Sequence, residues 1–119
     1  MKFISTKTHG VLDYLVGIFL IVSPWVFRLD PTSTQGMVFI ILGIMALVYS
    51  IFTNYELGLV KIIPIKMHLM LDIISGIVLA ASPWIFDFED TVYVPHLVLG
   101  LIEIAAGTMT QTKAWPKLQ

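Results

Sequence analysis

The feature that most constrains this chain is a set of four long apolar runs, at residues 11–27, 36–52, 69–86 and 91–109. The runs contain no lysine or arginine and at most one acidic residue each, namely Asp13, Asp72 and Glu103 in the first, third and fourth. About 20 apolar residues in a helix cross a hydrocarbon core of about 30 Å, and each run needs few flanking residues to reach that length. A membrane barrel would instead alternate apolar and polar residues along each strand. The sequence therefore predicts an all-α protein, a four-helix transmembrane bundle.

Composition supports the same fold class and excludes several functions. The chain has 119 residues, of which 57% are hydrophobic and only 13% charged, against about 25% charged in a typical soluble domain. Much of its surface is therefore expected to face lipid. The absence of cysteine excludes disulfides and thiolate chemistry. A net charge of −1 without a basic cluster argues against nucleic acid as a partner.

The basic residues predict an orientation in the membrane. Arg28 alone falls on one side of the predicted bundle. Because basic residues concentrate in cytoplasmic segments, we expect both termini and the central loop to be cytoplasmic, which makes the chain a multi-pass integral membrane protein. The residues on the cytoplasmic side are Lys2, Lys7, Lys61, Lys66, Lys113 and Lys117.

The chain contains an internal duplication. Residues 7–27 and 66–86 align at an offset of 59, and 11 of the 21 positions are identical. The identities include a histidine, an aspartate and the run Ser-Pro-Trp-x-Phe, which shared hydrophobicity does not explain. Residues 1–119 therefore read as a single membrane domain with repeats at about 7–56 and 66–112. Since each repeat has two helices, both enter the membrane from the same side as parallel repeats.

The duplicated motif resembles that of a known family. His-x-x-Leu-Asp-x-x-x-Gly followed by Ser-Pro-Trp-x-Phe, present twice in a small four-span chain, is similar to the SPW-repeat family of integral membrane proteins. The resemblance covers both repeats. It implies a membrane-embedded helical bundle and supplies no reaction.

The Ser-Pro-Trp motifs are expected to end helices near the outer surface. A proline inside a helix removes a backbone hydrogen bond, a nearby serine can bond the freed groups, and tryptophan favours the membrane interface. We favour this structural interpretation over a paired gate or ligand mouth. The residues are Ser23, Pro24 and Trp25 in the first repeat, and Ser82, Pro83 and Trp84 in the second.

The ionisable residues inside the spans fall on single helix faces, because they recur at helical spacing. An aspartate facing lipid costs about 2.5–3.5 kcal/mol or more at mid-span, so these faces should point into the bundle. The polar constellation consists of His9 and Asp13, His68 and Asp72, and His96 and Glu103. The glycines that share these faces, or occupy the matching face at an offset of 57, are expected to allow close helix packing: Gly17, Gly76, Gly43, Gly100 and Gly107.

Three functions are compatible with this pattern. The leading one is a non-enzymatic helix-packing or assembly module without a cofactor or metal, whose partners are the lipid bilayer and either a second copy or other membrane proteins. The second is a proton or cation path in which Asp13, Asp72 and Glu103 act as carriers and the three histidines stand at its two mouths. The third is a haem- or metal-binding redox module, which requires His9, His68, Asp13 and Asp72 to converge.

Overall fold

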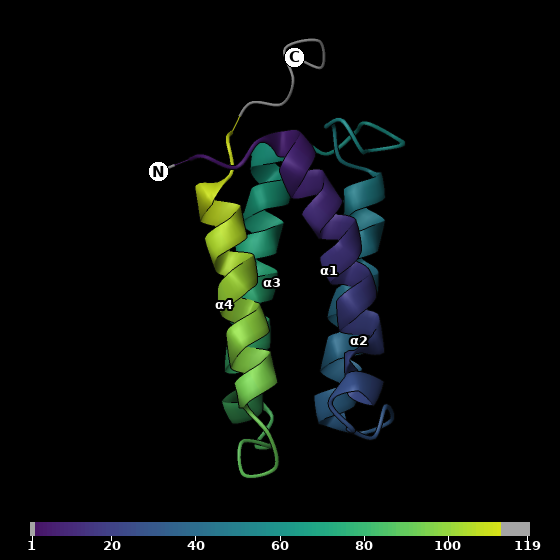
Figure 1. The fold of residues 1–119 in the computed structure, drawn as a ribbon, viewed down its shortest axis with the longest axis vertical. Coiled ribbons are helices and arrows are strands. Elements are labelled where there is room, and N and C mark those ends of the chain that lie inside the picture. The colour runs from purple at the N-terminus through teal and green to yellow at the C-terminus, as the bar shows by residue number, and fades with distance from the viewer. Residues whose placement is uncertain (1, 113–119) are drawn as a thin grey trace.

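The computed structural model describes residues 2–112, which form four helices: α1 (Thr6–Val26), α2 (Thr34–Ile51), α3 (Ile65–Ile85) and α4 (Val94–Met109). This confirms the predicted all-α four-helix bundle. α1 packs along α2, and α3 packs along α4, as two adjacent pairs (Figure 1). The loops within the two pairs lie at one end of the bundle, and the loop from α2 to α3 lies at the other (Figure 1). Lys113 and Lys117, which contribute to the predicted orientation, lie outside the described residues.

α1, α2 and α3 start earlier than the apolar runs because their first turns contain polar residues, whereas α4 starts at Val94, three residues after the start of the run at 91–109. α1 begins at Thr6, and the Ser5 hydroxyl accepts a hydrogen bond from the backbone N–H of Thr8, as expected of an N-cap. α2 is capped in the same way by Ser33. Prolines mark the other two starts, since Pro64 precedes α3 and Pro95 stands in the first turn of α4.

Three of the described helices, α1, α2 and α3, are long and apolar enough to cross a membrane. α4 has 16 residues, so it is about 24 Å long at 1.5 Å per residue. It is apolar but shorter than the others. Large aliphatic side chains point outward from all four helices; Leu15, Ile41, Ile77 and Leu101 are each 48–59% exposed. Such outward apolar faces suit lipid, and the chain is a membrane protein.

Glycines bring the two helices of each pair into backbone contact. A Cβ added to Gly43 on α2 would lie 2.8 Å from the carbonyl oxygen of Gly17 on α1. A Cβ added to Gly100 on α4 would lie 2.6 Å from the carbonyl oxygen of Gly76 on α3. The two crossings are equivalent under the offsets of 59 and 57. Gly107 adds a second approach of α4 to α3, beside the Leu69 carbonyl.

Both Ser-Pro-Trp motifs occupy the last turn of a helix. Pro24 and Pro83 are buried, and α1 and α3 each end two residues later. The serine hydroxyls donate to backbone carbonyls of the preceding turn, Ser23 to Phe19 and Ser82 to Leu79.

The chain then reverses through a residue in the left-handed region. Arg28 and Asp87 both have φ of 58°. The N–H of Leu29 donates to the Pro24 carbonyl, and the N–H of Phe88 donates to the Pro83 carbonyl. Trp25 and Trp84 point outward and are 60% and 48% exposed. The motif therefore terminates each helix and presents its tryptophan at the surface.

An apolar layer fills the bundle on the side of these motifs. Leu20 and Leu79, which are equivalent in the duplication, are both fully buried and pack with Phe39 and Leu42. The polar residues of α1 and α3 lie at the other end, near the helix starts.

Candidate functional site

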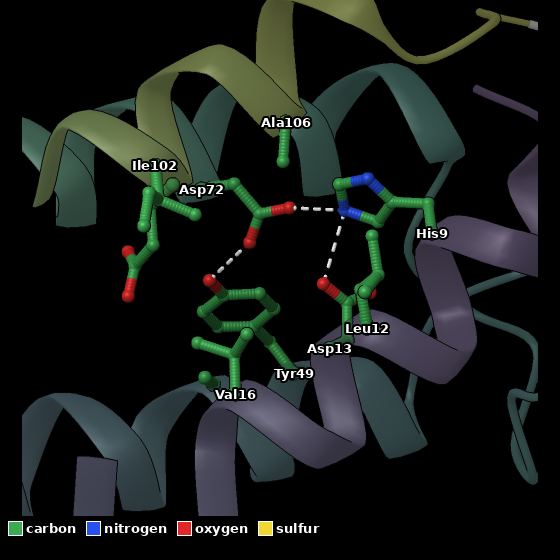
Figure 2. A pocket seen from close by; sticks show the side chains of 10 residues that line it. His9, Leu12, Asp13, Val16, Tyr49, Asp72, Ile102 and Ala106 are labelled. Atoms are coloured by element: carbon green, nitrogen blue, oxygen red, sulfur yellow. Dashed lines mark hydrogen bonds and ion pairs between the residues drawn. The ribbon is translucent and has the colours of Figure 1, made fainter. Parts of the chain in front are cut away.

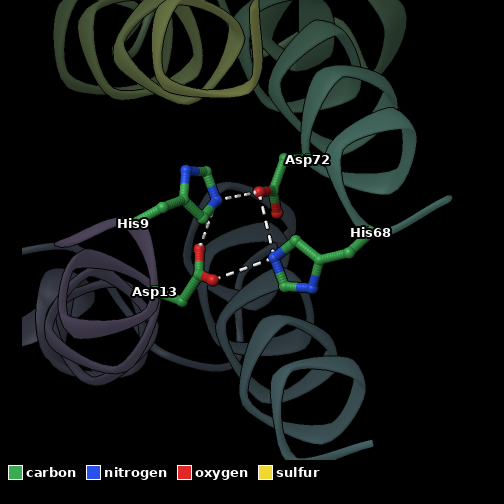
Figure 3. A group of neighbouring side chains, drawn as sticks. All are labelled: His9, Asp13, His68 and Asp72. Carbon is green, nitrogen blue, oxygen red and sulfur yellow. Dashed lines mark hydrogen bonds and ion pairs between the residues drawn. The ribbon is translucent and has the colours of Figure 1, made fainter. Parts of the chain in front are cut away.

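Four ionisable side chains from two helices converge on one point. His9 and Asp13 come from α1, and His68 and Asp72 come from α3 (Figure 3). Nε2 of His9 lies 2.6 Å from Asp72 Oδ2 and 3.0 Å from Asp13 Oδ1. Nε2 of His68 lies 2.8 Å from Asp13 Oδ2 and 3.2 Å from Asp72 Oδ2. Each histidine therefore faces both carboxylates, and the closest approach of each is to the aspartate of the other helix. We call these four residues the His/Asp cluster.

The His/Asp cluster is almost sealed from solvent. The two histidines are 1% and 0% exposed, and Asp72 is 6% exposed. No lysine or arginine among residues 2–112 forms an ion pair with either carboxylate. The cluster must therefore balance its own charge, because unpaired buried charges are strongly unfavourable.

Two threonines determine which ring nitrogen of each histidine carries a proton. The Thr110 hydroxyl donates its only proton to the Ala106 carbonyl at 2.6 Å, so it must accept from His9 Nδ1, which lies 2.7 Å away. Thr53 makes the same pair of contacts, with the Tyr49 carbonyl at 2.6 Å and His68 Nδ1 at 2.7 Å. Both histidines are thus protonated on Nδ1. Nε2 of His9 also hydrogen-bonds Asp72 Oδ2 at 2.6 Å, and because a carboxylate only accepts, this nitrogen carries a proton as well.

Two tyrosines orient the carboxylates. The Tyr55 hydroxyl donates to Asp13 Oδ2 at 2.8 Å, and the Tyr49 hydroxyl donates to Asp72 Oδ1. Tyr55 belongs to the loop between α2 and α3 and is fully buried, so this loop covers one side of the cluster. Burial raises the pKa of the Tyr55 hydroxyl above its usual value, and the charge of Asp13 raises it further. Tyr55 therefore remains a hydrogen-bond donor.

A cavity of about 70 Å³ lies beside the cluster. Its lining includes Asp13, Asp72 and Glu103 (Figure 2). Both Tyr49 and Ala106, which are equivalent at the offset of 57, line this cavity. Glu103 likewise stands where the first repeat has Ala46, and its Oε2 is buried without a hydrogen-bond partner.

His96 does not join the other polar residues. It lies in the apolar layer, where its ring stacks on Phe39 at 4.0 Å and its Nε2 bonds the Gln35 carbonyl at 2.9 Å. Phe39 is its equivalent in the first repeat. The structure therefore brings four of the six predicted residues together, adds Glu103 at the cavity, and leaves His96 at the far end.

Sequence reasoning missed the residues that surround the cluster. Thr53 and Thr110 are identical at the offset of 57, so the duplication itself carries a signal for them. Tyr49 and Tyr55 have no tyrosine at the equivalent positions 106 and 112. Nothing in the duplication marks them.

The cluster offers acid–base groups and metal ligands. Each of its residues supplies one ligand atom, and the four atoms lie within 4.8 Å of one another. Imidazole nitrogen with carboxylate oxygen is a donor set that suits Zn²⁺ and similar divalent ions. The hydroxyl groups that contact it within residues 2–112 belong to Thr53, Thr110, Tyr49 and Tyr55.

The model of the SPW repeat domain matches residues 7–110, which include both helix pairs and the whole His/Asp cluster. No curated protein and no solved structure matches the chain.

Proposed function

The chain belongs to the SPW repeat family, and from that membership and the closed His/Asp cluster we propose that it is a non-enzymatic, membrane-embedded packing module. In this proposal the cluster joins the two repeats across the interior of the bundle. The observation that carries it is that every cluster residue contacts the other repeat. Polar contacts between helices in lipid each contribute about 0.6–1.7 kcal/mol.

The polar residues are arranged unfavourably for a relay. A proton path needs ionisable groups at successive depths, whereas four of the six residues here lie at one depth. Toward His96 the interior is filled by the buried side chains of Leu20, Phe39, Leu42 and Leu79. This arrangement favours packing over conduction.

Proton flux in proteoliposomes tests the packing role. With a pH-sensitive dye inside and an imposed potential, wild-type protein is expected to give no flux above empty liposomes, and Glu103→Gln is expected to change nothing. His96→Phe is the matched control, because Phe39 already occupies the equivalent position. Wild-type flux that Glu103→Gln and the Asp13→Asn/Asp72→Asn variant both abolish would replace the packing role with conduction.

We further propose that both termini and the loop between α2 and α3 face the cytoplasm, with the repeats parallel across the membrane. The chain lacks cysteine, so single-cysteine variants report the side directly. Leu59→Cys, in a loop position 78% exposed, is expected to react with an impermeant thiol reagent only after the membrane is permeabilised from outside. Asp90→Cys, exposed in the loop before α4, is expected to react in intact cells. The reverse labelling pattern would invert the topology.

Assembly with other chains would use the outward apolar faces. The glycine contacts at Gly17, Gly43, Gly76 and Gly100 are already made within the chain, so they are not free for a second copy. Lipid, a second copy or another membrane protein would therefore meet side chains such as Leu15 and Leu101. Native mass spectrometry in detergent counts the copies.

A further inference from the structure

We propose that the His/Asp cluster is a binding site for one divalent transition-metal ion of the Zn²⁺ type, held between the two repeats. This deepens the packing role proposed above and rests on it, and it departs from the sequence-based expectation of no metal. The ligands would be Nε2 of both histidines and one carboxylate oxygen of each aspartate, which lie within 4.8 Å of one another. Ligands about 2.0–2.1 Å from a tetrahedral Zn²⁺ are about 3.3 Å apart. The nitrogen–oxygen separations of 2.6–3.2 Å would open only slightly to admit the ion.

The protonation of the histidines matches that of metal ligands. A histidine that binds a metal through one nitrogen usually donates the other N–H to a nearby oxygen, which fixes the ring. Thr110 and Thr53 are such acceptors for His9 and His68, because each has already given its own proton to a backbone carbonyl. Nε2 of both histidines therefore faces the centre of the cluster, where release of its proton would expose the lone pair that binds a metal.

One of those nitrogens lacks a partner. His68 is fully buried, and although its Nε2 is 2.8 Å from Asp13 Oδ2, neither aspartate oxygen near it has the direction of a hydrogen bond. A proton on this Nε2 would be left without a well-directed acceptor, and a bare lone pair would face carboxylate oxygens, which is repulsive unless positive charge lies between them. A metal ion at the centre supplies that charge and gives Nε2 a partner.

Charge and ligand type define the ion. Without metal, two carboxylates and two imidazolium rings balance to zero, and a divalent cation that displaces both Nε2 protons keeps that balance. The tyrosine hydroxyls at Asp13 and Asp72 hold the carboxylates in place as outer hydrogen-bond donors. Two imidazole nitrogens favour Zn²⁺ and related transition metals over Mg²⁺ and Ca²⁺, which prefer oxygen ligands alone.

The cavity beside the cluster offers the ion a route. Its lining includes Asp13 and Asp72, which Figure 2 labels, and also Glu103. With a volume of about 70 Å³ it has room for water, whose share of liquid volume is about 30 Å³ per molecule. Glu103 would attract a cation into this space without belonging to the ligand set.

The test uses the full chain in detergent after metal removal. Titration with Zn²⁺ against a chromophoric chelator is expected to give one bound ion per chain, and Co²⁺ is expected to produce the visible absorption of a four-coordinate site. His9→Ala and His68→Ala are expected to lose this binding, while His96→Phe keeps it. Thr110→Val, which leaves every ligand in place, is expected to weaken binding about 10–100-fold.

Folding is monitored separately, by circular dichroism and by the melting temperature without metal. Zinc is expected to raise the melting temperature of wild type and His96→Phe, but not of His68→Ala. Folded wild type that takes up no zinc, or uptake that survives both histidine substitutions, would overturn the metal site and leave the packing role in place. Proton flux through the zinc-loaded protein would instead overturn the packing role, so the two failures are distinct.

Discussion

Replacing Asp72 by Asn is expected to lower the free energy of unfolding of the bundle in detergent by about 2–5 kcal/mol. The Asp72 carboxylate lies against His9, His68 and the Tyr49 hydroxyl, and three contacts of about 0.6–1.7 kcal/mol each give this range. The upper end matches the cost of removing one partner from a buried ion pair. The asparagine keeps the shape but removes the charge that faces both histidines.

A carboxylate-to-amide change elsewhere provides the control. Asp90 lies exposed in the loop before α4, so Asp90→Asn is expected to change the free energy of unfolding by less than about 0.5 kcal/mol. Unfolding is followed by circular dichroism in mixed detergent and denaturant. Equal stability of Asp72→Asn and Asp90→Asn would mean that the cluster does not hold the repeats together.

Replacing Gly100 by Ala is expected to separate α4 from α3. The new Cβ would lie 2.5 Å from the Ala80 nitrogen and 2.6 Å from the Gly76 carbonyl oxygen. These are backbone atoms, so the helices themselves must move apart. Overpacking of this kind costs about 1–3 kcal/mol, partly offset by the better helix propensity of alanine, about 1 kcal/mol. Combining it with Gly43→Ala, at the equivalent crossing of the other pair, is expected to add the two effects because the sites are independent.

Gly10 supplies a glycine-to-alanine control in the same fold. The three atoms nearest to a Cβ there are side-chain atoms of Leu57, at 3.0–3.2 Å, and not backbone atoms of another helix. Gly10→Ala is therefore expected to leave stability unchanged or to raise it. If Gly100→Ala melts at the same temperature as Gly10→Ala, the backbone contact between α3 and α4 does not limit stability.

The duplication made much of the architecture predictable. Apolar length alone predicts the four helices, and spacing of four places His9 beside Asp13 and His68 beside Asp72. The convergence of the two pairs was not predictable, because it depends on how α1 and α3 approach each other in space. The sequence predicted six polar residues that could form one path through the bundle. The packing places His96 in the apolar layer, away from the His/Asp cluster.

The partners of the cluster were harder to predict. Thr53 and Thr110 follow the last turns of α2 and α4, and their roles depend on contacts with the helix starts of the other repeat. Tyr55 stands in a loop without regular structure, where no periodicity indicates that its side chain turns inward. The starts of α1 and α3 lie before the apolar runs because the first turns of these helices contain polar residues.

Each repeat supplies the threonine that bonds the histidine of the other repeat. His9 uses Thr110 of the second repeat, and His68 uses Thr53 of the first, so a half-length chain would find its missing partner only in another copy of itself. The full chain is in this sense a tethered dimer, whose loop between α2 and α3 keeps the effective concentration of each half high. Tethering also frees the halves to differ. Two identical halves would carry Tyr49 twice or Ala106 twice, whereas the fused chain has one of each, and it has Glu103 in one repeat opposite Ala46 in the other.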